Sequence, residues 1–382
     1  MSAPSSPAFV TVPTAPVSST TAPTPSIHRA RFEAALTGAV GADRSPVTAW
    51  QHHIPEESAI DALAARITTE VLTHDWDWVK VNPRATYLPE AWGNTYDLTD
   101  YTGVLPRRTH QVITSAADLA AIQPVAVAES TSLTDHVRLI ERLHGSLGDR
   151  PLLPTVFSPL SILLELAGLP SYASAATGEN DTTAVRTLTR WKAEHPEDLH
   201  AALAALTQTL IDYLAATRAA GADGVFYAVT GTVHPSITTP ELFADLSTPY
   251  DDAVLAATAG WHIVHTCGEQ SDPARFDRPG IHAIHWDQHA VGNPDVDLAL
   301  KAATVGGVSH LDAAANDARA VTEQTARALA LAARAGRTLL LAPACSVPPS
   351  VEPETYAALT SALRSFTPRA ASDPWPATSR PA

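Results

Sequence analysis

Eight short apolar runs, separated mostly by helix-like segments, constrain the fold of this 382-residue chain more than any other feature. Each run ends in polar or turn residues, as a β-strand does. Several are nearly continuous in apolar character, which is typical of strands that are covered on both faces. The runs lie at residues 46–50, 76–81, 153–157, 224–229, 261–265, 283–286, 304–308 and 338–342.

The segments between most of these runs carry apolar residues at three-four spacing, which predicts amphipathic helices. They lie at residues 57–73, 135–145, 196–220, 249–259, 315–335 and 353–364, and three of them begin near a proline, which suits the first turn of a helix. Alternation of strand and helix over eight repeats predicts an α/β fold, a single parallel (β/α)8 barrel of the TIM type.

Three stretches fall outside that repeat. Residues 82–130 are too long for a simple connection after the second strand, so we expect an extra hairpin or lid there. Residues 1–27 and 367–382 are rich in Pro, Ser, Thr and Ala, which predicts a disordered leader and a flexible tail. The barrel domain is therefore expected at 28–366.

Composition excludes several classes of function. The formal net charge of −15, with no cluster of Lys and Arg, argues against a nucleic-acid surface. No secretory signal and no apolar stretch of membrane-spanning length is visible. Two cysteines cannot build a disulfide framework, so the expected setting is the reducing cytoplasm, where thiolates stay available to a metal.

Both cysteines stand where a metal ligand is useful. Cys267 follows His265 by two residues at the end of the fifth run, and Cys345 follows the eighth run. Alternate residues of a strand share a face, and all strands of such a barrel open at one rim, so the three side chains are expected to meet. One imidazole and two thiolates suit catalytic zinc with an open fourth position. The alternative is that buried cysteines merely pack.

Further polar residues at the expected strand ends are candidates for the same rim. His52 and His53 are candidates for catalysis by proton transfer, although one of them is expected only to pack or face solvent. Tyr227 is a third catalytic candidate, or else an ordinary half-buried barrel residue. The candidates for binding substrate are Arg84, Tyr87, Trp286 and Asp287. The alternative for Arg84 is a structural ion pair. The alternatives for Asp287 are support of a metal-bound histidine and capping of a helix.

Eight segments together resemble the uroporphyrinogen decarboxylase superfamily over about residues 44–366. They are SPVTAWQHH, DWDWVKVNPRATYLPEAWG, TVFSPLSILLELAG, GADGVFYAVTG, WHIVHTCGE, AIHWD, TVGGV and LLLAPACSVPPSVEP, in this order. The resemblance implies a (β/α)8 barrel. It also implies one of two chemistries, cofactor-free decarboxylation of a porphyrinogen or zinc-dependent methyl transfer from methylcobalamin to a thiol such as coenzyme M.

The residues discriminate between the two branches. The decarboxylases carry arginines after the first strand, where this chain reads Gln51-His52-His53-Ile54-Pro55-Glu56. Their pyrrole-binding aspartate aligns with Arg84, and a cation cannot accept pyrrole hydrogen bonds. A second alignment, through the YLPE of 87–90, still replaces both arginines, by Asn82 and Thr86. The methyltransferases bear a His-x-Cys pair and a later Cys, which correspond to the three candidate zinc ligands.

The resemblance therefore favours a zinc-dependent methyltransferase that acts on a small thiol. A separate corrinoid protein is expected to supply the methyl group. Two alternatives remain, a cofactor-free decarboxylase acting on a porphyrinogen or a smaller acid, and a non-catalytic binder of tetrapyrroles or corrinoids. Nucleic acid and membrane are not expected as partners, and a homodimer is possible.

Overall fold

The computed structural model describes residues 25–39, 43–171 and 181–366. The predicted tail, 367–382, and residues 1–24 of the predicted leader lie outside the described residues. The last residues of that leader are described, and Ile27 already begins the first helix.

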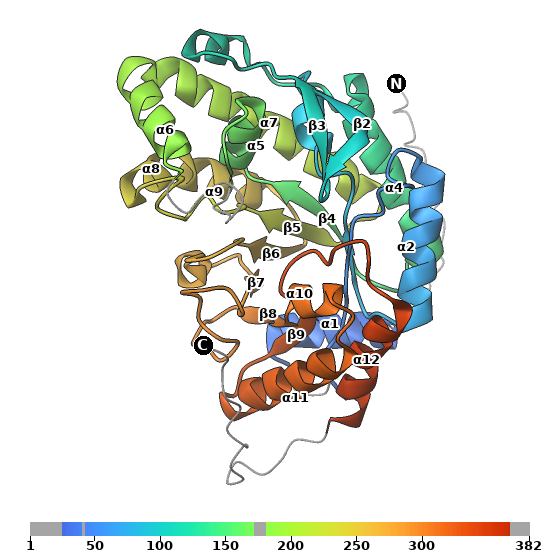
Figure 1. Cartoon of the computed structure of the whole chain (residues 1–382). Coiled ribbons are helices and arrows are strands. Elements are labelled where there is room, and N and C mark those ends of the chain that lie inside the picture. The colour runs from blue at the N-terminus through green and yellow to red at the C-terminus, as the bar shows by residue number, and fades with distance from the viewer. Residues whose placement is uncertain (1–24, 40–42, 172–180, 367–382) are drawn as a thin grey trace, which may run out of the picture.

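A curled sheet of seven parallel strands forms the centre of the molecule, in the order β1-β4-β5-β6-β7-β8-β9 (Figure 1). Neighbouring strands are in parallel register throughout, and every residue of β5, β8 and β9 is buried, which explains why these sequences are continuously apolar. The strands are β1 (Val79–Val81), β4 (Leu152–Phe157), β5 (Gly224–Ala228), β6 (Trp261–His265), β7 (Ala283–His285), β8 (Ala303–Val308) and β9 (Leu339–Pro343).

The first predicted strand, 46–50, forms only one isolated parallel bridge, Val47 with Leu341, and Gln51 just after it forms another with Val347. The Thr48 amide donates to Leu341 O at 3.1 Å, and the Asp77 amide donates to Val47 O at 2.8 Å. This segment thus lies between β9 and the chain entering β1. Pro46 has no N–H to donate, which limits the ladder at its start.

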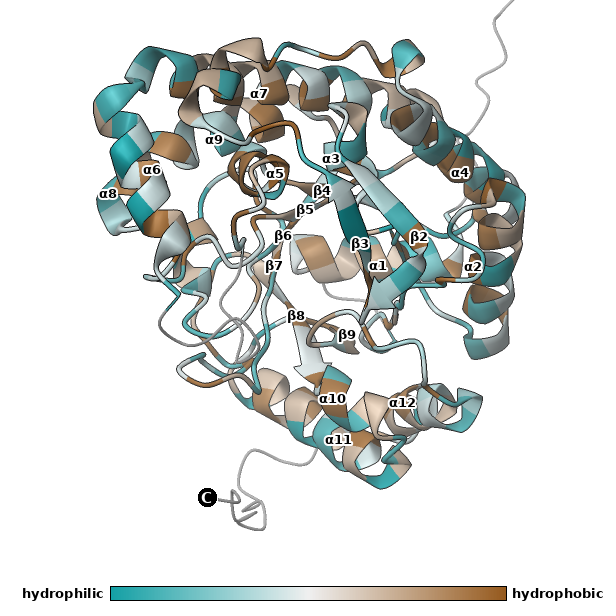
Figure 2. Cartoon of the chain, turned by 45° about the horizontal axis from the view of Figure 1, so that its top comes forward, coloured by the Kyte–Doolittle hydropathy of each residue, from teal (hydrophilic) through white to brown (hydrophobic). Residues whose placement is uncertain are grey.

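Twelve α-helices and three short 3-10 helices accompany the strands in the described part of the chain, and Figure 2 shows helices outside the curled sheet. All six predicted helices are present with shifted ends. The α-helices are α1 (Ile27–Thr37), α2 (Ile60–His74), α3 (Tyr87–Ala91), α4 (Thr131–Leu147), α5 (Pro159–Leu166), α6 (Thr183–Glu194), α7 (Pro196–Ala219), α8 (Pro240–Leu246), α9 (Thr248–Ala257), α10 (His310–Ala314), α11 (Ala318–Arg334) and α12 (Pro353–Ser365); the 3-10 helices are η1 (Ala116–Ala121), η2 (Val127–Glu129) and η3 (Pro273–Phe276).

Side-chain caps fix where the helices begin after several strands. Ser158 follows β4 directly and accepts a hydrogen bond from the Ser161 amide, and Pro159 takes the first position of α5. Ser309 does the same after β8 for α10. Each cap ends the strand at a defined residue, so the side chains just beyond the strand lie at the rim of the sheet.

Different elements cover the two ends of the curled sheet along the direction of its strands. At one of these ends, α1 packs its buried Phe32 against Trp78, with ring centroids 5.6 Å apart. An antiparallel pair of strands, β2 (Thr95–Thr102) and β3 (Leu105–His110), lies toward the opposite end, within the long segment after β1. Figure 2 shows α1 behind the strands and the β2–β3 pair in front of them.

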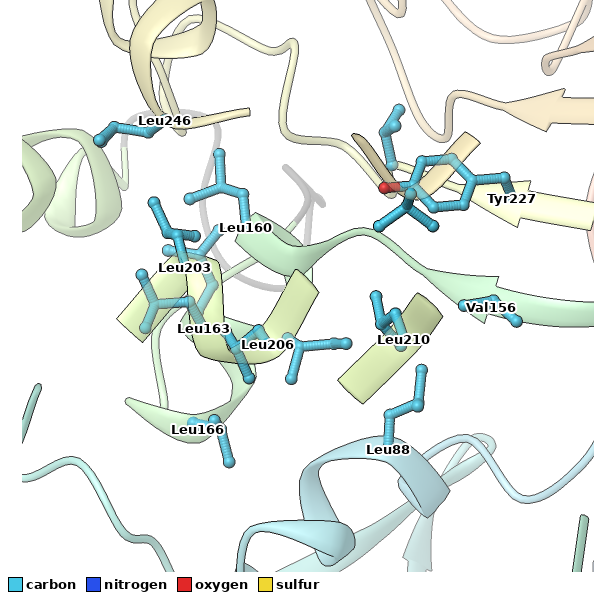
Figure 3. Packing of buried hydrophobic residues seen from close by; sticks show 14 of the residues in the cluster. Leu88, Val156, Leu160, Leu163, Leu166, Leu203, Leu206, Leu210, Tyr227 and Leu246 are labelled. Atoms are coloured by element: carbon cyan, nitrogen blue, oxygen red, sulfur yellow. The ribbon is translucent and has the colours of Figure 1, made fainter. Parts of the chain in front are cut away.

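Leucine-rich packing joins the outer face of the sheet to its helices. Val156 of β4 points outward into a buried cluster with Leu160 and Leu163 of α5 and Leu206 of α7 (Figure 3). Burial of such side chains stabilises the fold by about 1.5–3 kcal/mol each. None of the described helices has the length and hydropathy needed to span a membrane.

Candidate metal centre

His265, Cys267 and Cys345 meet at the rim of the sheet. Their ligand atoms all lie within 4.8 Å of one another, and no other group of this kind occurs in the described residues. His265 is the last residue of β6, and the Cys267 amide donates to Thr230 O at 2.7 Å. The Ala344 amide donates to Val308 O at 2.7 Å and holds the chain before Cys345. Backbone hydrogen bonds thus fix both cysteines from neighbouring strands.

The spacing of the sulfurs suits a shared metal ion. Cys267 Sγ and Cys345 Sγ lie 3.9 Å apart and are free thiols. Two sulfurs bound to one tetrahedral zinc, with bonds of about 2.3 Å, lie about 3.8 Å apart. Soft thiolates with one imidazole are a donor set that zinc prefers. The residues present therefore fit zinc.

The two thiols also perturb each other. Cys267 Sγ and Cys345 Sγ share one hydrogen bond, which holds the pKa of Cys345 well below its ordinary value. The same contact, together with burial, raises the pKa of Cys267 well above its ordinary value. The pair therefore already favours one thiolate, at Cys345, which is the form that binds metal.

A cavity of about 480 Å³ opens onto this centre. Alternate residues of successive strands line it, because side chains at i and i+2 share a face. Examples are Lys80 of β1 with Asn82 just after it, and Phe226 and Ala228 of β5. Its volume is that of an ordinary small-molecule site. Of the ten candidate site residues, six line it: His52, Arg84, Tyr87, His265, Cys267 and Cys345.

Lys80 is a cavity residue that the sequence analysis missed. It is 6% exposed, and its ammonium donates to Asn82 Oδ1 at 2.7 Å. The same nitrogen lies 5.1 Å from the ring centroid of Trp50 and 4.8 Å from that of Phe226. Burial lowers the pKa of Lys80 to about 7, while Cys345 and Cys267 raise it. A lysine in a strand expected to be buried on both faces was the signal for it.

Arg84 and Tyr87 line the cavity, but neither presents an unpaired polar group. Arg84 Nε donates to Glu90 Oε1 at 2.8 Å, and a second guanidinium nitrogen contacts Glu90 Oε2. Tyr87 is 3% exposed, and its hydroxyl donates to Thr155 O at 2.7 Å. The structural ion pair weighed as the alternative for Arg84 is therefore present.

The adjacent histidines point in different directions. His52 lines the cavity, and burial lowers its pKa to about 3, so it is neutral there. Its Nδ1 lies 3.9 Å from Glu57 Oε2, and both atoms are buried without a hydrogen-bond partner. His53 turns the other way and pairs with Glu70 of α2 at 3.2 Å. Only His52 can reach a molecule in the cavity.

Besides His53, three candidates do not line the cavity. Tyr227 alternates with the inward Phe226, so it points outward, where its hydroxyl donates to Asp251 Oδ1 at 2.6 Å (Figure 3). Trp286 likewise follows the inward His285 and donates to Pro294 O at 2.8 Å. Asp287 accepts from the His289 amide at 2.8 Å. Strand alternation turns the first two away from the metal centre.

Three more cavity residues were not among the candidates. Glu165 of α5 lines the wall, and burial raises its pKa to about 8 although Arg108 opposes this. His310 begins α10, and its Nδ1 lies 3.7 Å from Asp287 Oδ2. His285 pairs in register with His265, and that register was the available signal for it.

Comparisons with known proteins agree with this architecture. The chain superimposes on a methyltransferase from Methanosarcina mazei with a TM-score of 0.68 and 18% sequence identity, over 89% of this chain and 99% of that one. At this identity the likeness shows the fold alone. A comparison with curated proteins gave no match. The profile of the family described as Uroporphyrinogen decarboxylase (URO-D) matches residues 42–366, so the chain belongs to the uroporphyrinogen decarboxylase family.

Proposed function

We propose that this protein is a zinc-dependent methyltransferase that moves a methyl group from a corrinoid, carried by a separate protein, to a small thiol. The observation that carries the proposal is the approach of His265, Cys267 and Cys345 within 4.8 Å at the edge of a large cavity. The name of the Methanosarcina mazei relative is in keeping with it. The reducing cytoplasm is the proposed setting, because both thiols stay available there.

The three ligands would hold zinc with one coordination position left for substrate. When bound, zinc would lower the pKa of an entering thiol and keep it as the nucleophilic thiolate. A neutral His265 and two cysteine thiolates would cancel the charge of a bound zinc ion. A substrate thiolate therefore adds one uncompensated negative charge within a mostly apolar cavity.

Lys80 is the group we assign to that charge. Its amine lines the same cavity, and its neighbours are the Asn82 amide and two aromatic rings rather than a carboxylate. Arg84, by contrast, is already neutralised by Glu90. An ammonium at Lys80 favours a thiolate over a neutral thiol, because buried charges are stable only in pairs.

The β2–β3 pair lies where it can exclude water from the cavity. Residues 102–105, at the turn between β2 and β3, line the cavity, and Tyr101 of β2 donates to Glu57 Oε1 at 2.6 Å. We propose that this hairpin acts as a lid.

We also propose that residues 46–51 complete an eight-stranded (β/α)8 barrel, because they hydrogen-bond to β9 and lie beside β1.

The decarboxylase alternative has less support. It requires a cation free to bind a carboxylate, and the Arg84–Glu90 pair occupies the one that was considered. A free cationic partner would have to be Lys80, whose ammonium lies against Asn82, Trp50 and Phe226 and which we assign to the substrate thiolate. The alternative of a non-catalytic binder leaves the thiol pair without a role.

Methyl transfer tests the proposal. The zinc-loaded protein is incubated with methylcobalamin and a panel of small thiols, and thioether formation is followed by mass spectrometry. We expect turnover with at least one thiol and a loss of at least about 100-fold in Cys267→Ala and Cys345→Ala. His195→Gln, outside the cavity, is the matched control and should behave as wild type. Release of carbon dioxide from a porphyrinogen, or corrinoid binding without turnover, would instead support one of the alternatives.

A further inference from the structure

His285 connects the two strands that carry the metal ligands. It is the last residue of β7, is 0% exposed, and pairs in register with His265 of β6. Its Nε2 lies 2.9 Å from Pro343 O, at the end of β9 and two residues before Cys345. Its Nδ1 lies 2.8 Å from His265 Nδ1. One buried ring therefore contacts the strand of each ligand.

The carbonyl partner decides where the protons are. A carbonyl oxygen only accepts hydrogen bonds, so Nε2 of His285 carries a proton and donates to Pro343 O. The main-chain carbonyl of His285 also only accepts, and it lies 3.3 Å from His265 Nδ1, so this contact requires a proton on that nitrogen. His265 must then carry its proton on Nδ1 and donate it to His285.

The consequence for the metal centre follows directly. A neutral imidazole has one protonated nitrogen and one with a free lone pair. With Nδ1 of His265 protonated, only its Nε2 can bind a metal ion. The carbonyl of His285 lies 3.3 Å from the same Nδ1 and reinforces this tautomer. Both contacts to His265 thus select the same ligand atom.

Packing keeps the His285 ring in place. Its centroid lies 4.6 Å from that of His265, 5.2 Å from that of Trp50 and 5.5 Å from that of Phe226. With three rings against it and both nitrogens bonded, rotation would break contacts on every side. The ring therefore sets the orientation of His265 and its distance from the end of β9.

We propose that His285 is a positioning residue that selects the metal-binding tautomer of His265 and holds the His265 and Cys345 strands at ligand spacing. The inference rests on the proposed zinc centre for its effect on metal affinity. Partners of this kind, behind a metal-bound histidine, typically contribute about 10–100-fold in affinity. The tautomer itself does not depend on the metal, so it is tested separately.

Two substitutions distinguish positioning from simple packing. Glutamine offers an acceptor and a donor in one side chain, so His285→Gln can preserve both hydrogen bonds, whereas His285→Leu keeps bulk and removes both. Zinc affinity is measured by competition with a chromophoric chelator. We expect about 10–100-fold weaker binding in His285→Leu and less than about tenfold in His285→Gln. His282→Gln, which lies just before β7 and outside the cavity, is the control for a lost histidine.

Nitrogen-15 NMR of the metal-free wild type gives a readout that a structural role would not move. We expect His265 to carry its proton on Nδ1 in the wild type and in His285→Gln, and to hold that preference less strongly in His285→Leu, where only the main-chain carbonyl of residue 285 still accepts from Nδ1. A proton on Nε2 of His265 in the wild type would overturn the inference, as would equal zinc affinity in all three proteins. If no variant and no wild type binds zinc while the tautomer is as stated, the zinc proposal fails and the positioning role stands. Should His285→Leu fail to fold, the wild-type tautomer and His285→Gln decide.

Discussion

At the scale of single residues, buried groups with unusual partners carry the chemistry. Lys80 sits on aromatic rings beside the cysteine pair, and His52 faces the same cavity as a neutral imidazole. The adjacent His52 and His53 looked equivalent in the sequence, but His53 points away from the cavity and pairs with Glu70. Each of these side chains makes a distinct experimental prediction possible.

Replacing Lys80 with methionine should weaken thiol binding without removing the metal. The substitution keeps the aliphatic stem but removes the charge that offsets a bound thiolate, so affinity should fall by about tenfold or more. Half-maximal binding should also move to higher pH, because the thiolate is less favoured. Calorimetric titration over a pH series measures both, with the surface variant Lys192→Met as control. Unchanged affinity and pH dependence would remove Lys80 from the mechanism.

A buried histidine away from the cavity should make stability depend on pH. His136 of α4 is 2% exposed and hydrogen-bonds to the Tyr213 hydroxyl, and burial lowers its pKa to about 3. Between that value and the unfolded value of about 6.5, only the unfolded chain binds the proton. His136 therefore leaves the free energy of unfolding unchanged above pH 6.5. Below pH 6.5 it lowers that free energy by about 1.4 kcal/mol for each unit by which the pH falls.

His136→Gln should flatten that dependence. Urea unfolding between pH 5 and 7.5 should show a smaller loss of free energy on acidification than in the wild type. His110→Gln, at an exposed position of β3, should leave the slope unchanged. Equal slopes in all three proteins would contradict the assignment.

At the scale of elements, the β2–β3 hairpin is the part that can move without disturbing the sheet. Its pairing is antiparallel and separate from the parallel strands, and it shows shifts of register near Tyr96 and between Asp97 and Tyr101. Its turn borders the cavity. The hydrogen bond from Tyr101 to Glu57 joins it to the segment before α2.

Tyr101→Phe should loosen this element. Loss of a hydrogen bond to a carboxylate corresponds to about 10–100-fold faster local opening. Hydrogen exchange of residues 95–110 measures it, while zinc content should stay the same. Tyr96→Phe, on the same strand, removes only a long contact with Asn94 at 3.3 Å and is the matched control. Equal exchange rates in both variants would show that the hydrogen bond does not hold the hairpin.

At the scale of the whole molecule, the end of the sheet away from the cavity depends on one buried carboxylate. Asp77, whose side chain is 0% exposed, pairs with Arg31 at 3.0 Å and with Arg44 at 2.5 Å. His28 contacts it at 3.0 Å, and the Val47 amide donates to it at 2.9 Å. This cluster joins α1, the segment beside β9 and the start of β1.

Asp77→Ala should destabilise the whole fold, because it removes the carboxylate partner of Arg44 and leaves Arg31 paired with Asp43 alone. Breaking a buried ion pair by removing one side costs about 3–5 kcal/mol. Urea unfolding gives the value, and Asp61→Ala, which breaks the exposed pair with Arg142, should cost much less. A similar small effect of both variants would mean that the cluster does not anchor α1.

The sequence pattern predicted the positions of the strands better than it predicted which of their side chains point into the cavity. Strand–helix alternation predicted eight strands, of which seven form the sheet, and His265, Cys267 and Cys345 lie together as their places after the strands predicted. In a strand covered on both faces, hydropathy does not tell inward from outward residues, so Tyr227 and Trp286 were candidates although they point outward. Short helices such as α3 and α10 span one turn and carry too little periodicity to predict.

The central claim is that His265, Cys267 and Cys345 bind one zinc ion with a position open to a thiol. Zinc X-ray absorption spectroscopy of the wild-type protein, before and after addition of a substrate thiol, tests it most directly. We expect one zinc per chain, bound by two sulfurs at about 2.3 Å and one imidazole nitrogen at about 2.0 Å, with a third sulfur when the thiol is present. A protein that binds no zinc, or zinc whose sulfur signal persists in the Cys267→Ala/Cys345→Ala variant, would contradict the account.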